Sequence, residues 1–247
     1  MDALLPQAFG YLLVVFRCGG LCVALPVLGS SAVPKRIRLG MSLFFAMAAW
    51  AASGAHPVPL PHDLLQLASA SISETVIGLC AGFAAKVALE AAAMAGTLAG
   101  VGMGMGYGSM IDPNSGAEAP VLSNLLSALA LAAAISLGLH REAILWLAHS
   151  VRESPVTGHL EVMELSVHMI RSCTDGASLG LRLGLPFLGA VTLGHAGLGI
   201  IGRSTPQISL NSIGFTIAIF CGGAALWYFA PTAAHLAAGA AVATLQR

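Results

Sequence analysis

Long apolar stretches separated by short polar segments run through the whole chain, and this pattern predicts a series of membrane-spanning helices. A helix needs about 20 predominantly apolar residues to cross a bilayer. Uncharged stretches of this kind lie at Leu39–His62, Ala91–Ile111, Ala119–His140, Leu183–Gly202 and Ser204–Gln246. Two further apolar stretches, Leu12–Leu28 and Leu64–Ala85, each contain a single charged residue. Together these stretches predict about seven or eight helical segments.

Proline, glycine and polar residues mark the expected ends of these segments. The prolines of His56–Pro61 predict an extended connector, and Pro231 is expected to split the last apolar stretch into two helices. The glycine-rich segment 106–119 predicts a loop. Arg152–Asp175 is the most polar part of the chain, and its apolar spacing predicts an interfacial or soluble helix.

The composition agrees with a membrane protein or a very hydrophobic subunit of a larger assembly. Only 9% of the 247 residues are charged, and 57% are hydrophobic, whereas charged residues make up about 25% of ordinary soluble domains. The formal net charge is zero, which argues against a nucleic-acid partner because such a partner requires a basic face. The five cysteines form no C-x-x-C pair, so neither a disulfide framework nor a zinc site is expected.

Small residues recur at a spacing of four, which places them on one face of a helix. In a membrane such rows allow two helix backbones to approach closely. They therefore predict tight helix packing at three places, which are Gly78 and Gly82, then Gly96, Gly100, Gly104 and Gly108, and finally Gly176, Gly180 and Gly184.

Several charged residues lie inside or beside the apolar stretches. Each would cost about 2.5–3.5 kcal/mol at the centre of a bilayer, so we expect them to face protein, a partner subunit or a water-filled path. Lys86 and Glu90 are four residues apart and could pair on one helix face. A proton or ion relay and a set of structural or interface charges are both open, and the second is favoured because a relay needs converging carboxylates and histidines. The residues concerned are Arg17, Glu74, Lys86, Glu90, Arg182 and Arg203.

Motifs for covalent chemistry are missing from the sequence. It contains no H-E-x-x-H metalloprotease motif, no phosphate-binding P-loop and no G-x-S-x-G nucleophile elbow. The eight histidines show no ligand spacing. We therefore expect no catalytic residue, no cofactor and no metal ion.

The segment from 102 to 122 has the composition of a gate. Glycine at every second position from Gly102 to Gly108 disfavours a rigid helix. Bulky apolar side chains between flexible residues could close a pore, because hydrophobic constrictions can gate by dewetting. An ordinary loop between two helices fits the residues equally well. The candidate gate residues are Met103, Met105, Gly106, Tyr107, Gly108, Met110, Ile111, Asp112 and Pro113.

Four sequence blocks resemble the family of FliR, the export-gate protein of flagellar type III secretion, and its virulence-system relatives, the SctT group. The first block combines Phe16-Arg17 and Pro26 with Val33–Arg38, and the second is Glu74–Phe83. The third extends from Gly96 to Leu122, with Met105-Gly106-Tyr107 and Asp112-Pro113. The fourth comprises Leu183–Pro186, Leu198-Gly199 and Arg203–Gln207. The blocks occur in the family's order and cover nearly the whole chain.

This resemblance implies an all-α, polytopic membrane protein of kinked helical hairpins, which assembles helically with FliP-like and FliQ-like subunits. It implies one domain over 1–247, with a FliP-like part over about 1–175 and a FliQ-like hairpin over about 176–247. The plug of the export channel would be the loop 106–120. The charges of Arg17, Glu74 and Arg203 would lie at subunit contacts, and Pro206 and Gln207 belong to the same block as Arg203.

The implied function is a channel-forming subunit that passes unfolded export substrates across the bacterial inner membrane, in the flagellar basal body and partly raised towards the periplasm. Further implied partners are FlhA-like and FlhB-like export components and membrane lipid. The blocks look more flagellar than SctT-like, but a virulence system stays open. A second alternative is a secondary transporter that uses Glu74, Lys86 and Glu90. The basic cluster Lys35, Arg36 and Arg38 would place its loop in the cytoplasm, although a raised subunit need not obey that rule.

Overall fold

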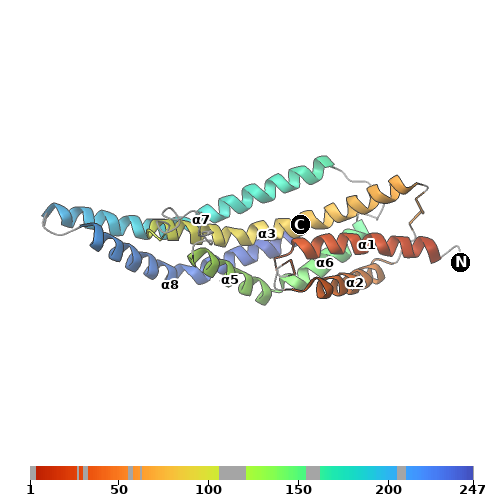
Figure 1. Cartoon of the computed structure of the whole chain (residues 1–247), viewed down its shortest axis with the longest axis horizontal. Coiled ribbons are helices and arrows are strands. Elements are labelled where there is room, and N and C mark those ends of the chain that lie inside the picture. The colour runs from red at the N-terminus through yellow and green to blue at the C-terminus, as the bar shows by residue number, and fades with distance from the viewer. Residues whose placement is uncertain are drawn as a thin grey trace. The chain divides into compact units, whose positions relative to one another are not determined.

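The structure, a computed structural model, is helical throughout its regular parts. It describes residues 4–26, 28–29, 33–54, 58–61, 63–105, 121–153, 162–204 and 210–246, with side chains for all of these except 4, 201–204 and 210–213. Within them, all regular secondary structure is α-helix, which confirms the expected all-α class. The helices are α1 (Leu4–Ala24), α2 (Lys35–Ala52), α3 (Leu64–Gly102), α5 (Val121–Ser136), α6 (Leu139–Glu153), α7 (Val162–Ser204) and α8 (Leu210–Leu245), as Figure 1 shows.

Three of the helices are much longer than the sequence pattern predicts. α3 joins two expected segments into one helix of 39 residues, with Lys86 and Glu90 inside it. α7 has 43 residues and α8 has 36. Four helices of the described chain (α1, α3, α7 and α8) are long and apolar enough to cross a membrane, or up to five spans if α5 and α6 form one broken span. The chain is thus a polytopic helical membrane protein.

Two expected boundaries are wrong. The first is at Pro231, which lies inside α8 and does not divide it. Interior proline is tolerated in apolar helices because neighbouring groups can satisfy the freed carbonyl. The polar segment Arg152–Asp175 is not a separate interfacial helix either, since α7 begins at Val162 and continues through it to Ser204.

The described chain falls into two compact units that interleave along the sequence. The first unit contains residues 1–87, 137–173 and 241–247, and the second contains 88–136 and 174–240. The first unit therefore holds α1, α2, α6, the first part of α3 and the start of α7. The second holds α5, the last part of α3 and most of α7 and α8. The expected division near residue 175 separates a FliP-like part from a FliQ-like part. These compact units do not test that resemblance, so the division stays a prediction.

In the first unit, α1 and α3 cross with their backbones almost in contact, and three glycines make this possible. A Cβ added at Gly78 would overlap the carbonyl oxygen of Arg17 and lie 2.9 Å from the nitrogen of Leu21. A Cβ added at Gly20 would overlap the carbonyl oxygen of Thr75. Gly82, one turn after Gly78, faces α1 in the same way. The predicted close packing at the first glycine pair is thus present between α1 and α3.

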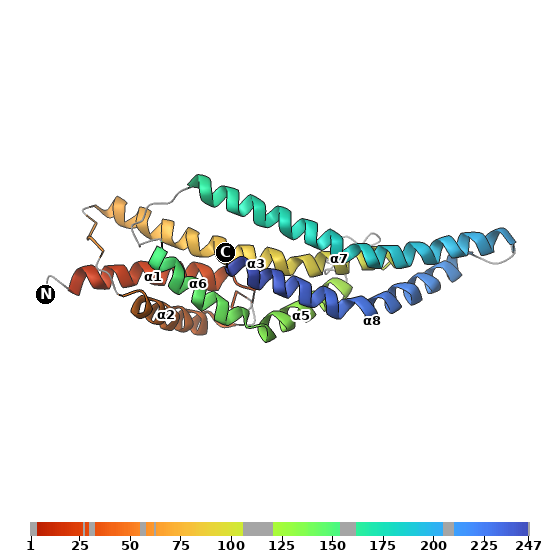
Figure 2. The same cartoon turned by 180° about the vertical axis from the view of Figure 1, so that it is seen from behind.

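α2 and α6 complete the first unit, and both lie beside α1 in the two opposite views (Figures 1 and 2). The inner face of α2 is made of the small buried residues Ser42, Ala46 and Ala49. The hydroxyl of Tyr11 in α1 donates a 3.1 Å hydrogen bond to the carbonyl of Leu43. At the other end of α2, Arg152 donates from Nε and Nη2 to the carbonyl of Ala52, at 3.2 and 2.7 Å. These bonds satisfy or supplement helical carbonyls.

In the second unit, α7 packs on α3 through the third glycine row, while α8 packs on α7. A Cβ at Gly184 would overlap the side chain of Leu98, and one at Gly180 would lie 2.8 Å from the sulfur of Met94. Phe187 of α7 and Phe229 of α8 meet edge to face, with ring centroids 6.2 Å apart. The glycines therefore bring α7 close to α3, and an aromatic pair with Phe187 buried and Phe229 half-buried lies between α7 and α8.

Adjacent glycines of α1 provide a matched test of the α1–α3 crossing. Gly20→Ala should destabilise the protein by about 1–3 kcal/mol, because overpacking of a tight contact costs that much. Gly19→Ala should be neutral or slightly stabilising, since a Cβ there meets no atom within 4 Å and alanine is the better helix former. Thermal unfolding of the purified chain in mild detergent measures both. Equal melting temperatures for the two variants would contradict the close crossing.

Candidate functional site: a buried ion pair and the start of the glycine-rich segment

Arg17 and Glu74 form an ion pair in the core of the first unit. The Nε of Arg17 donates to Oε2 of Glu74 over 2.6 Å. Each residue is only 1% exposed. A pair this deeply buried is an unusual element, because removing two charges from water costs several kcal/mol per ion unless hydrogen bonds satisfy them.

The glycine crossing explains how these two charged groups meet. Glu74, Gly78 and Gly82 are spaced by four residues and so follow one stripe of α3. Gly78 contacts the backbone of Arg17 itself. The close approach of the two backbones thus places the guanidinium beside the carboxylate one turn away. The sequence indicates each charge and the glycine pair separately, and the structure brings them together.

A third helix satisfies the rest of the guanidinium. Nη1 of Arg17 donates to the carbonyl oxygen of Ser150 at 2.9 Å and to its hydroxyl oxygen at 2.7 Å. Ser150 lies in the last turn of α6, where carbonyls have no partner within the helix and a cation is favourable. Arg17 therefore joins α1, α3 and α6. Among the described residues, no buried side-chain nitrogen or oxygen lacks a hydrogen-bond partner.

The burial of Arg17 and Glu74 bears on the expectation that they contact partner subunits. Side chains that are 1% exposed in the single chain do not reach a neighbouring protein directly. Any effect of these residues on assembly acts through the shape of the first unit. Nothing in the sequence pointed to Ser150, because serines are common throughout the apolar helices and this one is distinguished only by its place at a helix end.

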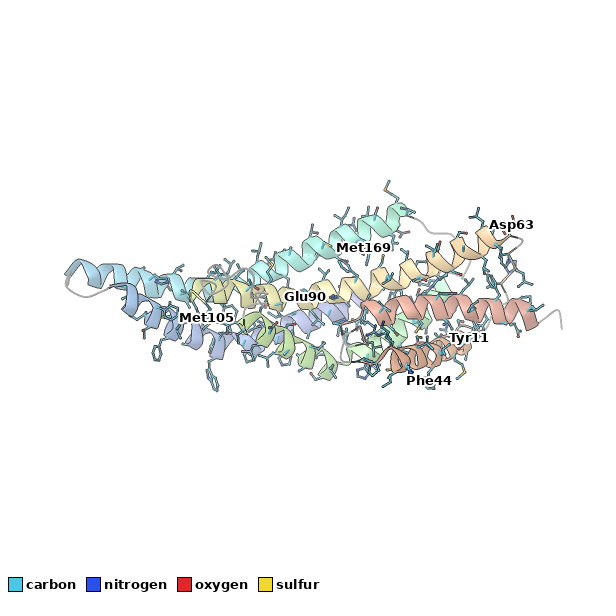
Figure 3. All side chains as sticks on the ribbon, in the orientation of Figure 1. Tyr11, Phe44, Asp63, Glu90, Met105 and Met169 are labelled. Carbon is cyan, nitrogen blue, oxygen red and sulfur yellow. The ribbon has the colours of Figure 1, made fainter. Side chains whose placement is uncertain are left out.

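The other predicted charges lie elsewhere. Lys86, Glu90 and Arg182 are exposed, and Glu90 is labelled in Figure 3. Within the described residues, neither Lys86 nor Glu90 takes part in an ion pair. Thus the spacing-based pair is not formed. The side chain of Arg203, together with Pro206 and Gln207, lies outside the described residues.

α3 ends at the glycine-rich segment with a defined hydrogen-bonded cap. Gly104 has a φ of 77°, in the left-handed region that favours glycine. The amide of Met105 donates to the carbonyl of Gly100 at 2.9 Å, and that of Gly104 donates to Val101 at 3.0 Å. These two bonds form a Schellman motif, which satisfies the last carbonyls of the helix. Gly104 is the third member of the predicted glycine row, and it lies two residues beyond the end of α3 at Gly102.

Met103 is anchored in the core of the second unit rather than standing free. It is buried, and its side chain lies against Gly222 of α8, where an added Cβ would overlap it. Met105, two residues later, is exposed and marks the end of the described part of this segment (Figure 3). The candidate gate residues that follow, Gly106, Tyr107, Gly108, Met110, Ile111, Asp112 and Pro113, lie outside the described residues. Gly222 was not recognised from the sequence, since it is one of 29 glycines.

These features define an α-helical polytopic membrane protein whose buried polar groups hold helices together. In the described part of the chain, no group of three or more His, Cys, Asp or Glu residues could hold a metal ion. Residues 8–242 match the family model of bacterial export proteins, family 1, and the chain belongs to that family.

Three similar proteins, each matched over most of its length, are named flagellar biosynthetic protein FliR. The flagellar biosynthetic protein FliR of Escherichia coli (strain K12) is 28% identical over 235 residues, covering 92% of this chain and 87% of that protein. The FliR of Caulobacter vibrioides is 23% identical, covering 87% and 86%. The FliR of Bacillus subtilis (strain 168) is 22% identical, covering 89% and 85%.

Removing one charge of the buried pair should be worse than removing both. Arg17→Met and Glu74→Met each leave a buried partner charge uncompensated, which costs about 3–5 kcal/mol. The double variant should recover a large part of that loss. Melting temperatures of the four proteins in detergent form the double-mutant cycle, with the exposed Arg182→Met as control. If the two single losses simply add in the double variant, the pair is not coupled.

Proposed function

We propose that this chain is the FliR-type subunit of a flagellar protein export gate, which forms a channel with FliP-like and FliQ-like subunits. Unfolded export substrates would pass through this channel across the bacterial inner membrane. The observation that carries the proposal is the match of residues 8–242 to the export-protein family. The flagellar assignment rests on relatives named flagellar biosynthetic protein FliR, which align over most of their own length. Those names favour the flagellar role over the virulence alternative.

The exposed surface of the long helices is consistent with a subunit that is covered by other components. In α8, Phe220, Trp227 and Tyr228 are all largely exposed, with Trp227 reaching 88%. α7 exposes several aliphatic side chains, including Leu185 and Leu193. Soluble monomers rarely expose such continuous apolar area. Lipid and partner subunits of the same apolar character would cover it.

The residues expected to contact those partners are now fewer. Lys86, Glu90 and Arg182 are exposed on α3 and α7, and they can meet charges on FliP-like or FliQ-like subunits. We keep Arg203, Pro206 and Gln207 in this group on the sequence block alone. FlhA-like and FlhB-like components remain proposed neighbours on the same basis, as does a position partly raised towards the periplasm.

The anchored start of the glycine-rich segment supports its role as a plug. Met103 is held on Gly222, and the Schellman cap ends α3 at a fixed point. A plug requires at least one end that is fixed in the structure, because a segment with no fixed end would not stay in the channel. We propose that residues 106–120, entering from Met105, close the channel in the resting assembly. Their glycines would permit the movement that opens it.

The secondary-transporter alternative loses its support at the buried pair. Glu74 is the carboxylate such a relay would need, and it is engaged by Arg17 and buried. Lys86 and Glu90 are exposed side chains and do not pair with each other. A relay requires titratable groups that converge on a water-filled path, and these three groups do not form such a cluster.

Deletion of residues 106–116 tests the plug directly. The gate assembled with its FliP-like and FliQ-like partners should form normally, because the anchoring residues are retained. It should also conduct small ions in the resting state. Single-channel conductance in planar bilayers, with co-purification as the assembly control, gives the result. A fully assembled complex with the closed conductance of the unmodified gate would overturn the plug assignment.

A pair of adjacent glycines in α8 tests the anchor without shortening the chain. Gly222→Ala should displace the side chain of Met103, because the added methyl group would overlap that side chain. Gly223→Ala is the matched control, since a Cβ there meets no atom within 4 Å. We expect more frequent openings of the assembled gate for Gly222→Ala alone. Identical conductance records for the two variants would exclude a role of Met103 in holding the segment.

A further inference from the structure

α2 differs from the other helices of the first unit because it carries charge at one end of an otherwise apolar outer face. It is 18 residues long but is not among the helices apolar enough to cross a membrane. Its first turn contains Lys35, Arg36 and Arg38, which the sequence presents as one basic cluster. In the structure, the three basic residues of this cluster do not have the same contacts.

Arg38 binds the backbone of its own chain. Its Nε donates a 2.8 Å hydrogen bond to the carbonyl oxygen of Leu28, so it holds the segment that leads into α2. Lys35 and Arg36 are exposed, and neither is part of an ion pair within the described residues. Two cationic groups therefore stand at the beginning of α2 with no partner carboxylate in the part of the chain that the structure describes.

An apolar stripe continues from Arg36 along the outside of the helix. Each residue of this stripe lies three or four positions from another member, so the residues share one face. They are Arg36, Gly40, Leu43, Phe44 and Met47, all of them exposed. Phe44 is 63% exposed and stands on the outer side of α2 (Figure 3). The opposite face, with Ser42, Ala46 and Ala49, is the one that is buried.

We propose that this face of α2 binds anionic phospholipid of one leaflet, with the phosphate at Lys35 and Arg36 and an acyl chain along Gly40–Met47. The order of groups along the helix matches the order within a lipid, with charge at one end and hydrocarbon beyond it. From Ile37 to Met47 the helix rises about 15 Å, which is about half of the 30 Å hydrocarbon core. A leaflet therefore has the depth that the stripe can cover.

The charge selects the lipid class. Cationic residues next to a membrane attract anionic headgroups by an amount that corresponds to about 5-fold in binding for each Lys or Arg. Long basic side chains can extend towards the headgroups while their stems remain on apolar surface. Gly40 leaves room in the middle of the stripe, since nothing lies within 4 Å of the place a Cβ would take.

Photo-crosslinking in intact cells identifies what covers the stripe. A photoreactive benzoyl-phenylalanine at position 44 should attach to phospholipid, which adds one lipid mass to the purified chain. The same probe at the equally apolar position 227 provides the comparison, because α8 contains no Lys, Arg, Asp or Glu. We expect the share of anionic lipid among the adducts to be higher at position 44. Attachment to a polypeptide at position 44, or an equal anionic share at both positions, would overturn the proposal.

Charge variants separate the headgroup contact from the apolar one. Lys35→Gln with Arg36→Gln should lower the preference for phosphatidylglycerol over phosphatidylcholine by about 5-fold for each charge removed, measured by lipid retention of the full chain in detergent. Lys35→Arg should keep the preference. Lys86→Gln with Arg182→Gln removes the same charge from other exposed positions. An equal loss in this second pair would show that total charge, and not α2, determines the selectivity.

Discussion

The packing of the first unit depends on the close approach of the α1 and α3 backbones. Because Gly20, Gly78 and Gly82 let α1 and α3 nearly touch, the short distance between them can be bridged by Arg17 and Glu74. The guanidinium then also binds the end of α6 through Ser150. A bulkier residue at the crossing would separate the helices and leave both charges buried without partners. In an apolar setting that penalty is severe, so packing and electrostatics depend on the same three positions.

Much of the fold follows from patterns that the sequence displays openly. Apolar stretches, glycine rows and the charges inside them are local properties, and each predicts a helix or a close contact. The points at which one helix ends and the next begins are harder to predict from the sequence. Lys86 and Glu90 look like an interruption, yet α3 passes through them because exposed charges are tolerated where the helix face is open. Pro231 looks like a break, but one proline does not end a helix that its neighbours support.

The candidate site was predictable in its parts and not in its connections. Arg17 and Glu74 are 57 residues apart, and no periodicity links them. For Met103, the sequence suggests a more exposed side chain than the structure has. A methionine between glycines suggests a free gate residue, whereas its side chain is buried on Gly222 of α8. Only the tertiary contact reveals that the segment has a fixed end, because both glycine and methionine occur many times along this chain.

The length of α3 has a consequence for how this helix is covered. At 1.5 Å per residue its 39 residues measure about 58 Å, nearly twice the hydrocarbon core of a bilayer. An upright α3 cannot be solvated by lipid over its whole length. The remainder has to be covered by protein, and α1 and α7 of the same chain supply part of that cover. Without that cover, the apolar residues beyond the hydrocarbon core would be exposed to water, so the helix can keep this length only inside packed protein.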